Sequence, residues 1–239
     1  MRQKPVTRQA ILGLLIALLI IAIWGLNLVY LLTRHLATWP SALIPLGVLF
    51  QTFLYTGMFI TAHDSMHRAL YPPNRAINDA LGAAVVFLYA LFGYRKLRAR
   101  HYDHHRTPAS PDDPDYHDGK HRSLLAWYFH FMLHYLDWKQ LLGMAILFNV
   151  LLHLVKIPIA NLLLFWVAPA LLSTLQLFIF GTYLPHRDGE PAFRDQHRAR
   201  SNAYPVWLSF LSCYHFGYHW EHHAHPNVPW WRLPAARVA

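Results

Sequence analysis

The stretch His219-Trp220-Glu221-His222-His223, close to the C-terminus, decides how the rest of the chain has to fold. Residues three and four positions apart lie on one face of a helix, so this spacing predicts three imidazoles that point at one spot. The segment 101–105 repeats the spacing, and 63–67 places two histidines four positions apart. Eight imidazoles are too many for one metal ion and suit two. The candidate ligands are His63, His67, His101, His104, His105, His219, His222 and His223.

The composition is that of a membrane protein, and it limits the ligands available to a metal. Of the 239 residues, 55% are hydrophobic and 14% are charged, whereas a soluble domain has roughly 25% charged residues. Cys213 is the only cysteine, which excludes a thiolate-cluster site and leaves nitrogen and oxygen ligands. Imidazole suits iron, copper, zinc and nickel, so the histidine spacing predicts a shared geometry without choosing the metal.

Four uncharged runs are expected to cross a membrane as two helical hairpins, since a helix needs about 20 residues to span the hydrocarbon core. The first run is too long for a cleavable signal peptide, so we expect it to be retained. We therefore predict an all-α integral membrane protein with a single domain over 1–239. Its four transmembrane helices are expected at about 10–32, 41–62, 140–155 and 159–184.

The segments between the spans are expected to lie at the membrane surface. A full crossing by 76–94 would place 63–67 and 101–105 on opposite faces, so we predict an interfacial or re-entrant helix there. The aromatic-rich segment 123–138 suits the membrane interface. The short apolar segment 203–217 is expected to form a surface or buried helix.

The distribution of charge predicts the sidedness of this topology. The chain has 21 Lys and Arg residues and a formal net charge of +9, and only Arg34 and Lys156 fall in the two hairpin turns. Cytoplasmic segments of membrane proteins carry an excess of Lys and Arg, so the opposite face, with all three histidine segments, is expected to face the cytoplasm. The positive charge then reflects membrane topology, and nucleic-acid binding is not expected.

Two other kinds of metal protein fit the sequence less well. A zinc protease of the HExxH type needs a glutamate after the first histidine, and Asp64 stands at that position. Metal transporters normally carry ionisable groups within their spans, and the four predicted spans contain no Asp, Glu, Lys or Arg. A non-enzymatic metal-binding protein stays open as an alternative to an enzyme.

Several polar residues near the histidine segments keep two interpretations. His215 precedes His219 by one helical turn and is either a ligand or a neighbour of one. The carboxylates inside the segments either accept a hydrogen bond from a metal-bound imidazole or pair with the Arg-rich run 95–106. These carboxylates are Asp64, Asp103 and Glu221. His130 and His134 are an isolated pair at helical spacing, which we interpret as structural.

With these features the chain resembles the membrane fatty-acid desaturase and hydroxylase superfamily, whose members carry such histidine segments around two membrane hairpins. The closer similarity is to the beta-carotene ketolases, and four strings carry it. The most specific is Phe180-Gly181-Thr182-Tyr183-Leu184-Pro185-His186-Arg187, at the end of the last predicted span. The others are His63–His67, Pro111–His117 and Tyr214–His223.

The resemblance implies a centre of two non-haem iron ions held by histidines, with dioxygen as co-substrate and electrons from an external, ferredoxin-like donor. It implies that C4 of a beta-ionone ring is hydroxylated twice and loses water to leave a ketone. Beta-carotene would give echinenone and then canthaxanthin, entering from the bilayer of a bacterial inner or cyanobacterial membrane. A fatty-acid or other lipid desaturase or hydroxylase is the alternative. Carried over to this chain, the resemblance adds His186 as a ninth ligand and leaves catalytic groups beyond the metal site unknown.

Overall fold

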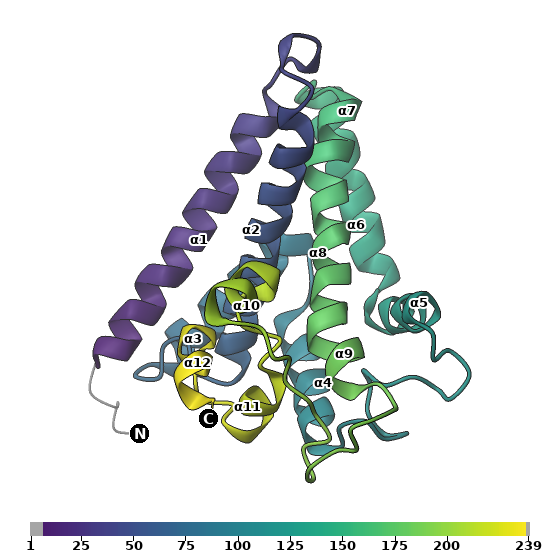
Figure 1. The fold of residues 1–239 in the computed structure, drawn as a ribbon. Coiled ribbons are helices and arrows are strands. Elements are labelled where there is room, and N and C mark those ends of the chain that lie inside the picture. Colours follow the sequence, from purple (N-terminus) through teal and green to yellow (C-terminus); the bar gives the residue numbers. More distant parts are fainter. Residues whose placement is uncertain (1–6, 238–239) are drawn as a thin grey trace.

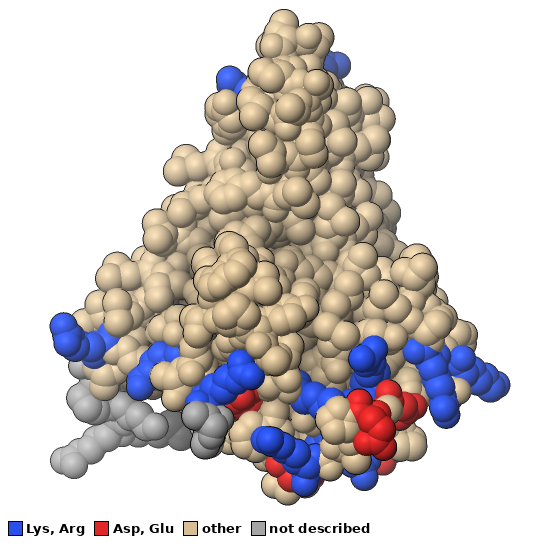
Figure 2. All heavy atoms as spheres, viewed as in Figure 1, with Lys and Arg blue, Asp and Glu red and all other residues tan. Residues whose placement is uncertain are grey.

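The computed structural model describes residues 7–237, and within that range the chain is built of helices without a β-strand. Figure 1 shows two long hairpins that converge at one end of the molecule and spread apart at the other. The wider end holds α4 (Tyr94–Arg106), α11 (His219–Ala224) and α12 (Leu233–Ala236). Figure 2 shows that most of the charged side chains visible on this face gather at the wider end, and we call it the charged end.

The first hairpin consists of α1 (Arg8–Leu32) and α2 (Leu43–Met66), joined by a turn that contains η1 (Leu36–Thr38). Leucines of α1 such as Leu26, 73% exposed, present an apolar surface of the kind that lipid covers. α2 continues beyond the predicted end at 62, because residues 63–66 are buried in the interior. His63 therefore lies within the helix rather than after it.

The second hairpin consists of α6 (Trp138–Asn149), which continues as η2 (Val150–Leu154), and the run Ile159–His186. Near its start, Asn161 donates from Nδ2 to the carbonyls of Leu31 (3.0 Å) and Arg34 (2.8 Å), which ties the two hairpins together at their narrow end. The run comprises α7 (Ile159–Leu162), η3 (Leu163–Val167), α8 (Ala168–Phe178), η4 (Ile179–Tyr183) and α9 (Leu184–His186), and η2, η3 and η4 are π-helical.

Three helical runs in the described range are long and apolar enough to cross a membrane, namely Arg8–Leu32, Leu43–Met66 and Ile159–His186. They agree with three of the four predicted spans. The fourth, predicted at 140–155, is the shorter apolar helix Trp138–Leu154, and its crossing stays a prediction. The chain is thus an all-helical membrane protein with three apolar runs, or four if the bent pair of helices Arg75–Ala90 and Tyr94–Arg106 counts as one.

That bent pair returns the second histidine segment to the first. α3 (Arg75–Ala90) begins after Asn74, whose side chain accepts hydrogen bonds from two backbone N–H groups of the first turn. It ends at Leu91, which adopts the left-handed conformation with φ of 56°, and the chain bends by 101° into α4. The bend places 101–105 beside the end of α2, as the predicted re-entrant course requires.

The aromatic helix α5 (Leu124–Tyr135) lies across the wider part of the molecule, beside the lower half of the second hairpin (Figure 1). Its Trp127 is fully buried and packs edge-on against Phe178, with ring centroids 5.8 Å apart. Phe129 and Leu133 are 62% and 75% exposed. This division between a buried and an apolar exposed face suits the predicted position at the membrane interface.

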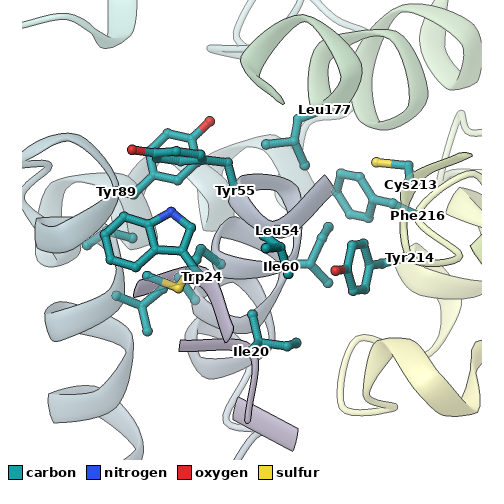
Figure 3. Packing of buried hydrophobic residues seen from close by; sticks show 14 of the residues in the cluster. Ile20, Trp24, Leu54, Tyr55, Ile60, Tyr89, Leu177, Cys213, Tyr214 and Phe216 are labelled. Carbon is teal, nitrogen blue, oxygen red and sulfur yellow. The ribbon is translucent and has the colours of Figure 1, made fainter. Parts of the chain in front are cut away.

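The C-terminal segment closes the interior at the charged end. It contains α10 (Val206–Cys213), α11, η5 (Trp230–Arg232) and α12. The predicted helix over 203–217 is interrupted, because Tyr214 and His215 adopt positive φ values of 49° and 61°. Figure 3 shows Tyr214 and Phe216 pointing from this turn toward Ile60 of α2. The turn thereby aims α11 at the segments of α2 and α4.

Candidate metal centre

Nine buried or half-buried histidines form two groups at the charged end, and in each group the ligand nitrogens lie within 4.8 Å of one another. They come from α2, α4, α9 and α11, together with His67 directly after α2. The first group is His63, His67, His101, His105 and His222. The second group is His104, His186, His219 and His223.

The prediction that each three-histidine segment points at one spot is wrong. On α11, His219 and His223 belong to the second group and His222 to the first. On α4, His101 and His105 belong to the first group and His104 to the second. A helix turns by about 100° per residue, so positions four apart are nearly aligned while adjacent positions diverge. His222 and His223 therefore face different centres. Each segment contributes to both groups, which keeps the two groups side by side.

The imidazoles of each group face one another through their Nε2 atoms. In the first group His67 and His101 are 2.6 Å apart, and His105 and His222 are 2.9 Å apart. In the second group the Nε2 of His223 lies 3.1 Å from that of His104 and 3.0 Å from that of His219. A neutral imidazole has only one N–H to donate, so hydrogen bonds between the rings cannot satisfy all of these nitrogen atoms. A cation bound between them would accept the remaining lone pairs.

Two further observations show that the residues present fit metal ions. The Nε2 atoms of His63 and His186 are buried and have no hydrogen-bond partner among the described residues. Burial, followed by the neighbouring imidazoles, lowers the pKa of each histidine of α11 well below its usual value. These side chains are therefore neutral at physiological pH and keep the lone pair that a metal requires. Four or five nitrogen donors in each group suit iron among other metals.

Groups around the histidines fix some of their orientations. Nδ1 of His104 lies 3.0 Å from both carboxylate oxygens of Asp113, and Nδ1 of His186 lies 2.8 Å from the carbonyl oxygen of Arg198. An N–H at Nδ1 directed to such an acceptor leaves Nε2 with its lone pair toward the centre. Asp113 was not predicted as part of the site. Its one sequence signal is its place in the string Pro111–His117.

Asp64, Asp103 and Glu221 were predicted either to accept a hydrogen bond from a metal-bound imidazole or to pair with the Arg-rich run 95–106. In the part of the chain that the structure describes, Asp64 is the one whose carboxylate lies within 4 Å of a ring nitrogen of a candidate ligand. It is 3.9 Å from Nδ1 of His63 and also accepts the backbone N–H of Trp230 at 3.1 Å. Asp103 pairs instead with Arg106, and Glu221 accepts a hydrogen bond from the Ser201 hydroxyl.

His215, left open in the sequence, lies outside both groups. Its ring stacks on that of Tyr218 with centroids 5.7 Å apart and tilts against Trp230. His186, in contrast, is in the second group, as the resemblance implies. His130 and His134 lie on α5 outside both groups.

An apolar cavity with an empty volume of about 740 Å³ reaches the histidines from the side of α5. Its walls come from α3, α4, α5, α8 and η4, and His101, His104 and His219 line it. Most other lining residues are aromatic or aliphatic, including Phe59, Phe131, Met132, Leu177 and Phe178. This apolar lining, with a few polar groups at its inner end, is typical of sites that bind apolar organic molecules.

The π-helical turn η4 shapes the inner end of this cavity. Gly181 lies against the ring of Phe216, where a Cβ atom would collide with the ring carbons. Phe216 in turn packs edge-on against His63 (4.8 Å) and His219 (5.1 Å). The glycine therefore lets one aromatic ring support a histidine from each group.

We expect Gly181→Ala to destabilise the protein by about 1–3 kcal/mol, the usual cost of overpacking a filled interior, and to lower its metal content. Thermal unfolding in detergent and elemental analysis measure the two effects. Gly25→Ala on α1 is the matched control, because no atom of residues 7–237 outside its own helix turn lies within 4 Å of a Cβ there. A Gly181→Ala protein as stable and as metal-rich as the control would contradict this role of the glycine.

Comparison with known proteins agrees with this centre. The model of the fatty acid desaturase family matches residues 37–148 and 134–239. The chain is 42% identical to a beta-carotene ketolase of Paracoccus sp., over 78% of this chain and 76% of that protein. It is 39% identical to the zeaxanthin 4-ketolase of Chlamydomonas reinhardtii, over 94% of this chain and 53% of that protein. It is 42% identical to the beta-carotene 4-ketolase 3 of Haematococcus lacustris, over 86% and 66%.

The chain therefore belongs to the fatty acid desaturase family. Within the family its similarity to beta-carotene ketolases confirms the predicted resemblance, and the chain is an oxygen-dependent oxidoreductase of the membrane.

Proposed function

We propose that the chain introduces 4-keto groups into the beta-ionone rings of carotenoids by two successive hydroxylations at C4, followed by loss of water. The observation that carries this proposal is the apolar cavity that ends at His101, His104 and His219. A carotenoid is a stiff, apolar polyene, and such a cavity gives its terminal ring an apolar route to the histidines. The relatives named above act on carotenoids by their names, which supports the same substrate class.

The two groups would hold two non-haem iron ions, the first with five histidines and the second with four. Bound iron would supply the activation of dioxygen. Each hydroxylation consumes one dioxygen molecule, two electrons and two protons, and gives one hydroxyl group and one water. One ketone therefore needs two dioxygen molecules and four electrons from an external donor, which we take to be a ferredoxin-like protein.

The protein's own residues would bind the substrate, orient the histidines and keep water out of the cavity. Asp113 orients His104, and Phe216 separates the histidines from the apolar interior. Most of the cavity wall is apolar, which keeps water from the reacting carbon. Three acidic or phenolic side chains also line it, and each is hydrogen-bonded: Tyr135 donates to Asp115, and Tyr89 donates to Ser173 at 3.0 Å. The basic residues at the charged end support a cytoplasmic position for the centre, with the carotenoid entering from the bilayer.

Expression in a bacterium that already makes beta-carotene tests the proposal. We expect a red shift of the pigment and carotenoids that carry one or two keto groups, measured by absorbance and mass spectrometry. Cells expressing His130→Ala, a histidine outside both groups, should behave as wild type. Unchanged pigment together with oxidised fatty acids would indicate the lipid oxygenase instead. Unchanged pigment and lipids, with zinc or copper bound in place of iron, would indicate a metal-binding protein.

A further inference from the structure

A second hollow opens at the charged end, on the outer side of α11 and away from the apolar cavity. Its empty volume is about 1000 Å³, and the loop 191–201 forms one wall. We call it the arginine groove, because its lining includes Arg194, Arg200, Arg237 and Trp220. The one acidic residue that lines it, Glu221, is buried and hydrogen-bonded to Ser201. The groove is therefore basic.

Trp220 connects this groove to the metal centre. It stands between two buried residues of α11, yet its own ring is partly exposed. Its indole N–H donates to Asp195 at 2.9 Å, and Arg194 lies over the ring, 5.9 Å from its centroid. The ring of His197 lies 6.3 Å from Trp220 and 6.5 Å from His223, centroid to centroid. Two aromatic side chains thus separate the groove from the second group.

The composition of the groove is that of a protein-binding surface. Arg and Trp are enriched in the centres of protein interfaces and among the residues that contribute most to binding. The groove has three guanidinium groups and one carboxylate, although Arg237 lies 4.0 Å from that carboxylate of Glu221. The remaining positive charge favours an acidic partner, and charge complementarity speeds the association of such pairs.

Resting on the proposed function, we infer that the arginine groove docks an acidic one-electron carrier protein. The carrier would be oxidised by one electron at each encounter, so two encounters supply one hydroxylation and four supply one ketone. Trp220 and His197 lie between the docked carrier and His223. The groove thereby brings the external donor toward the second group through residues that do not line the apolar cavity.

Arg194 is the residue to change, since it is exposed and its guanidinium lies over the ring of Trp220. Arg200 is unsuitable, because it donates to three backbone carbonyls and holds the loop. The control is Lys120→Glu, which makes the same change of charge at an exposed position of the loop 107–122.

The experiment measures the affinity of the purified, metal-loaded full chain in detergent for a plant-type [2Fe–2S] ferredoxin, at low and at high salt. We expect Arg194→Glu to weaken binding about tenfold at low salt, Lys120→Glu to stay within about twofold, and salt to weaken binding to the wild type. Equal losses in both variants, or no loss in Arg194→Glu, would overturn the inference. So would a loss of binding to anionic phospholipid vesicles with ferredoxin binding unchanged, since the groove would then be a lipid site.

Pigment analysis in beta-carotene-producing cells separates this inference from the proposed function. A wild-type chain that binds the carrier through Arg194 but forms no ketone overturns the function alone. A wild-type chain that forms ketones but does not bind the carrier overturns the docking site alone.

Discussion

Replacing His222 by alanine is expected to abolish ketone formation while the protein still inserts into the membrane. His222 is the candidate ligand by which α11 contributes to the first group, and its Nε2 lies 2.9 Å from that of His105. It lies outside the three long apolar runs, so membrane insertion does not depend on it. Loss of one imidazole leaves a buried centre with a missing donor, and the bound iron should fall from about two ions per chain to about one.

The control for this prediction is a histidine of α5 that lies outside both groups. His130→Ala removes an imidazole that belongs to neither group, and it should retain both the iron and the activity. Iron content is measured on purified protein and ketones on whole cells, so that binding and turnover are scored independently. Full activity of the His222→Ala protein would show that the first group is not the metal site.

The division of the helix between two groups sharpens this test. His222 and His223 are neighbours in the sequence, but they face the first and the second group respectively. Alanine at either position should therefore leave about one iron, bound in each case by the group that keeps all its histidines. Spectra of the two half-loaded proteins should differ, since the remaining ligand sets have five and four histidines.

Helical periodicity explains how much of this centre the sequence could predict. Eight of the nine histidines in the two groups were named as candidate ligands from helical spacing, and His186 was added only by the family resemblance. The structure brings all nine together, and their binding of metal stays a prediction. The divergence of adjacent histidines follows from helical periodicity alone, whereas the partners that each one meets depend on where α2, α4 and α9 lie around α11. The re-entrant course followed from a simple requirement, namely that 63–67 and 101–105 share a face.

Other parts of the site depend on tertiary packing that local sequence does not encode. The loop 107–121 holds Asp112, Asp113, Asp115 and Asp118, and its sequence does not show which of them turns inward. Asp112 is exposed, whereas Asp113 is buried beside His104. The π-helical turn η4 and the cavity likewise result from contacts between segments far apart in the chain. The crossing of the predicted span 140–155 stays a prediction for a related reason, since an apolar run gives composition but not its end points.

Asp113 is buried beside His104, and we expect Asp113→Asn to lower the affinity of the second group for metal by about 10–100-fold. This is the usual cost of removing the hydrogen-bond partner of a metal-binding histidine. Besides holding Nδ1 of His104, the oxygens of Asp113 accept the backbone N–H groups of Ala109 (2.8 Å) and Asp115 (2.9 Å). The amide of asparagine keeps one acceptor but turns an NH₂ group toward a donor, so it cannot satisfy all three. Asp112→Asn, one residue earlier and exposed, removes the same charge without these contacts and should bind metal as wild type. Loss of iron to a chelator, followed over time, distinguishes the variants, and equal loss from both would mean that Asp113 does not position His104.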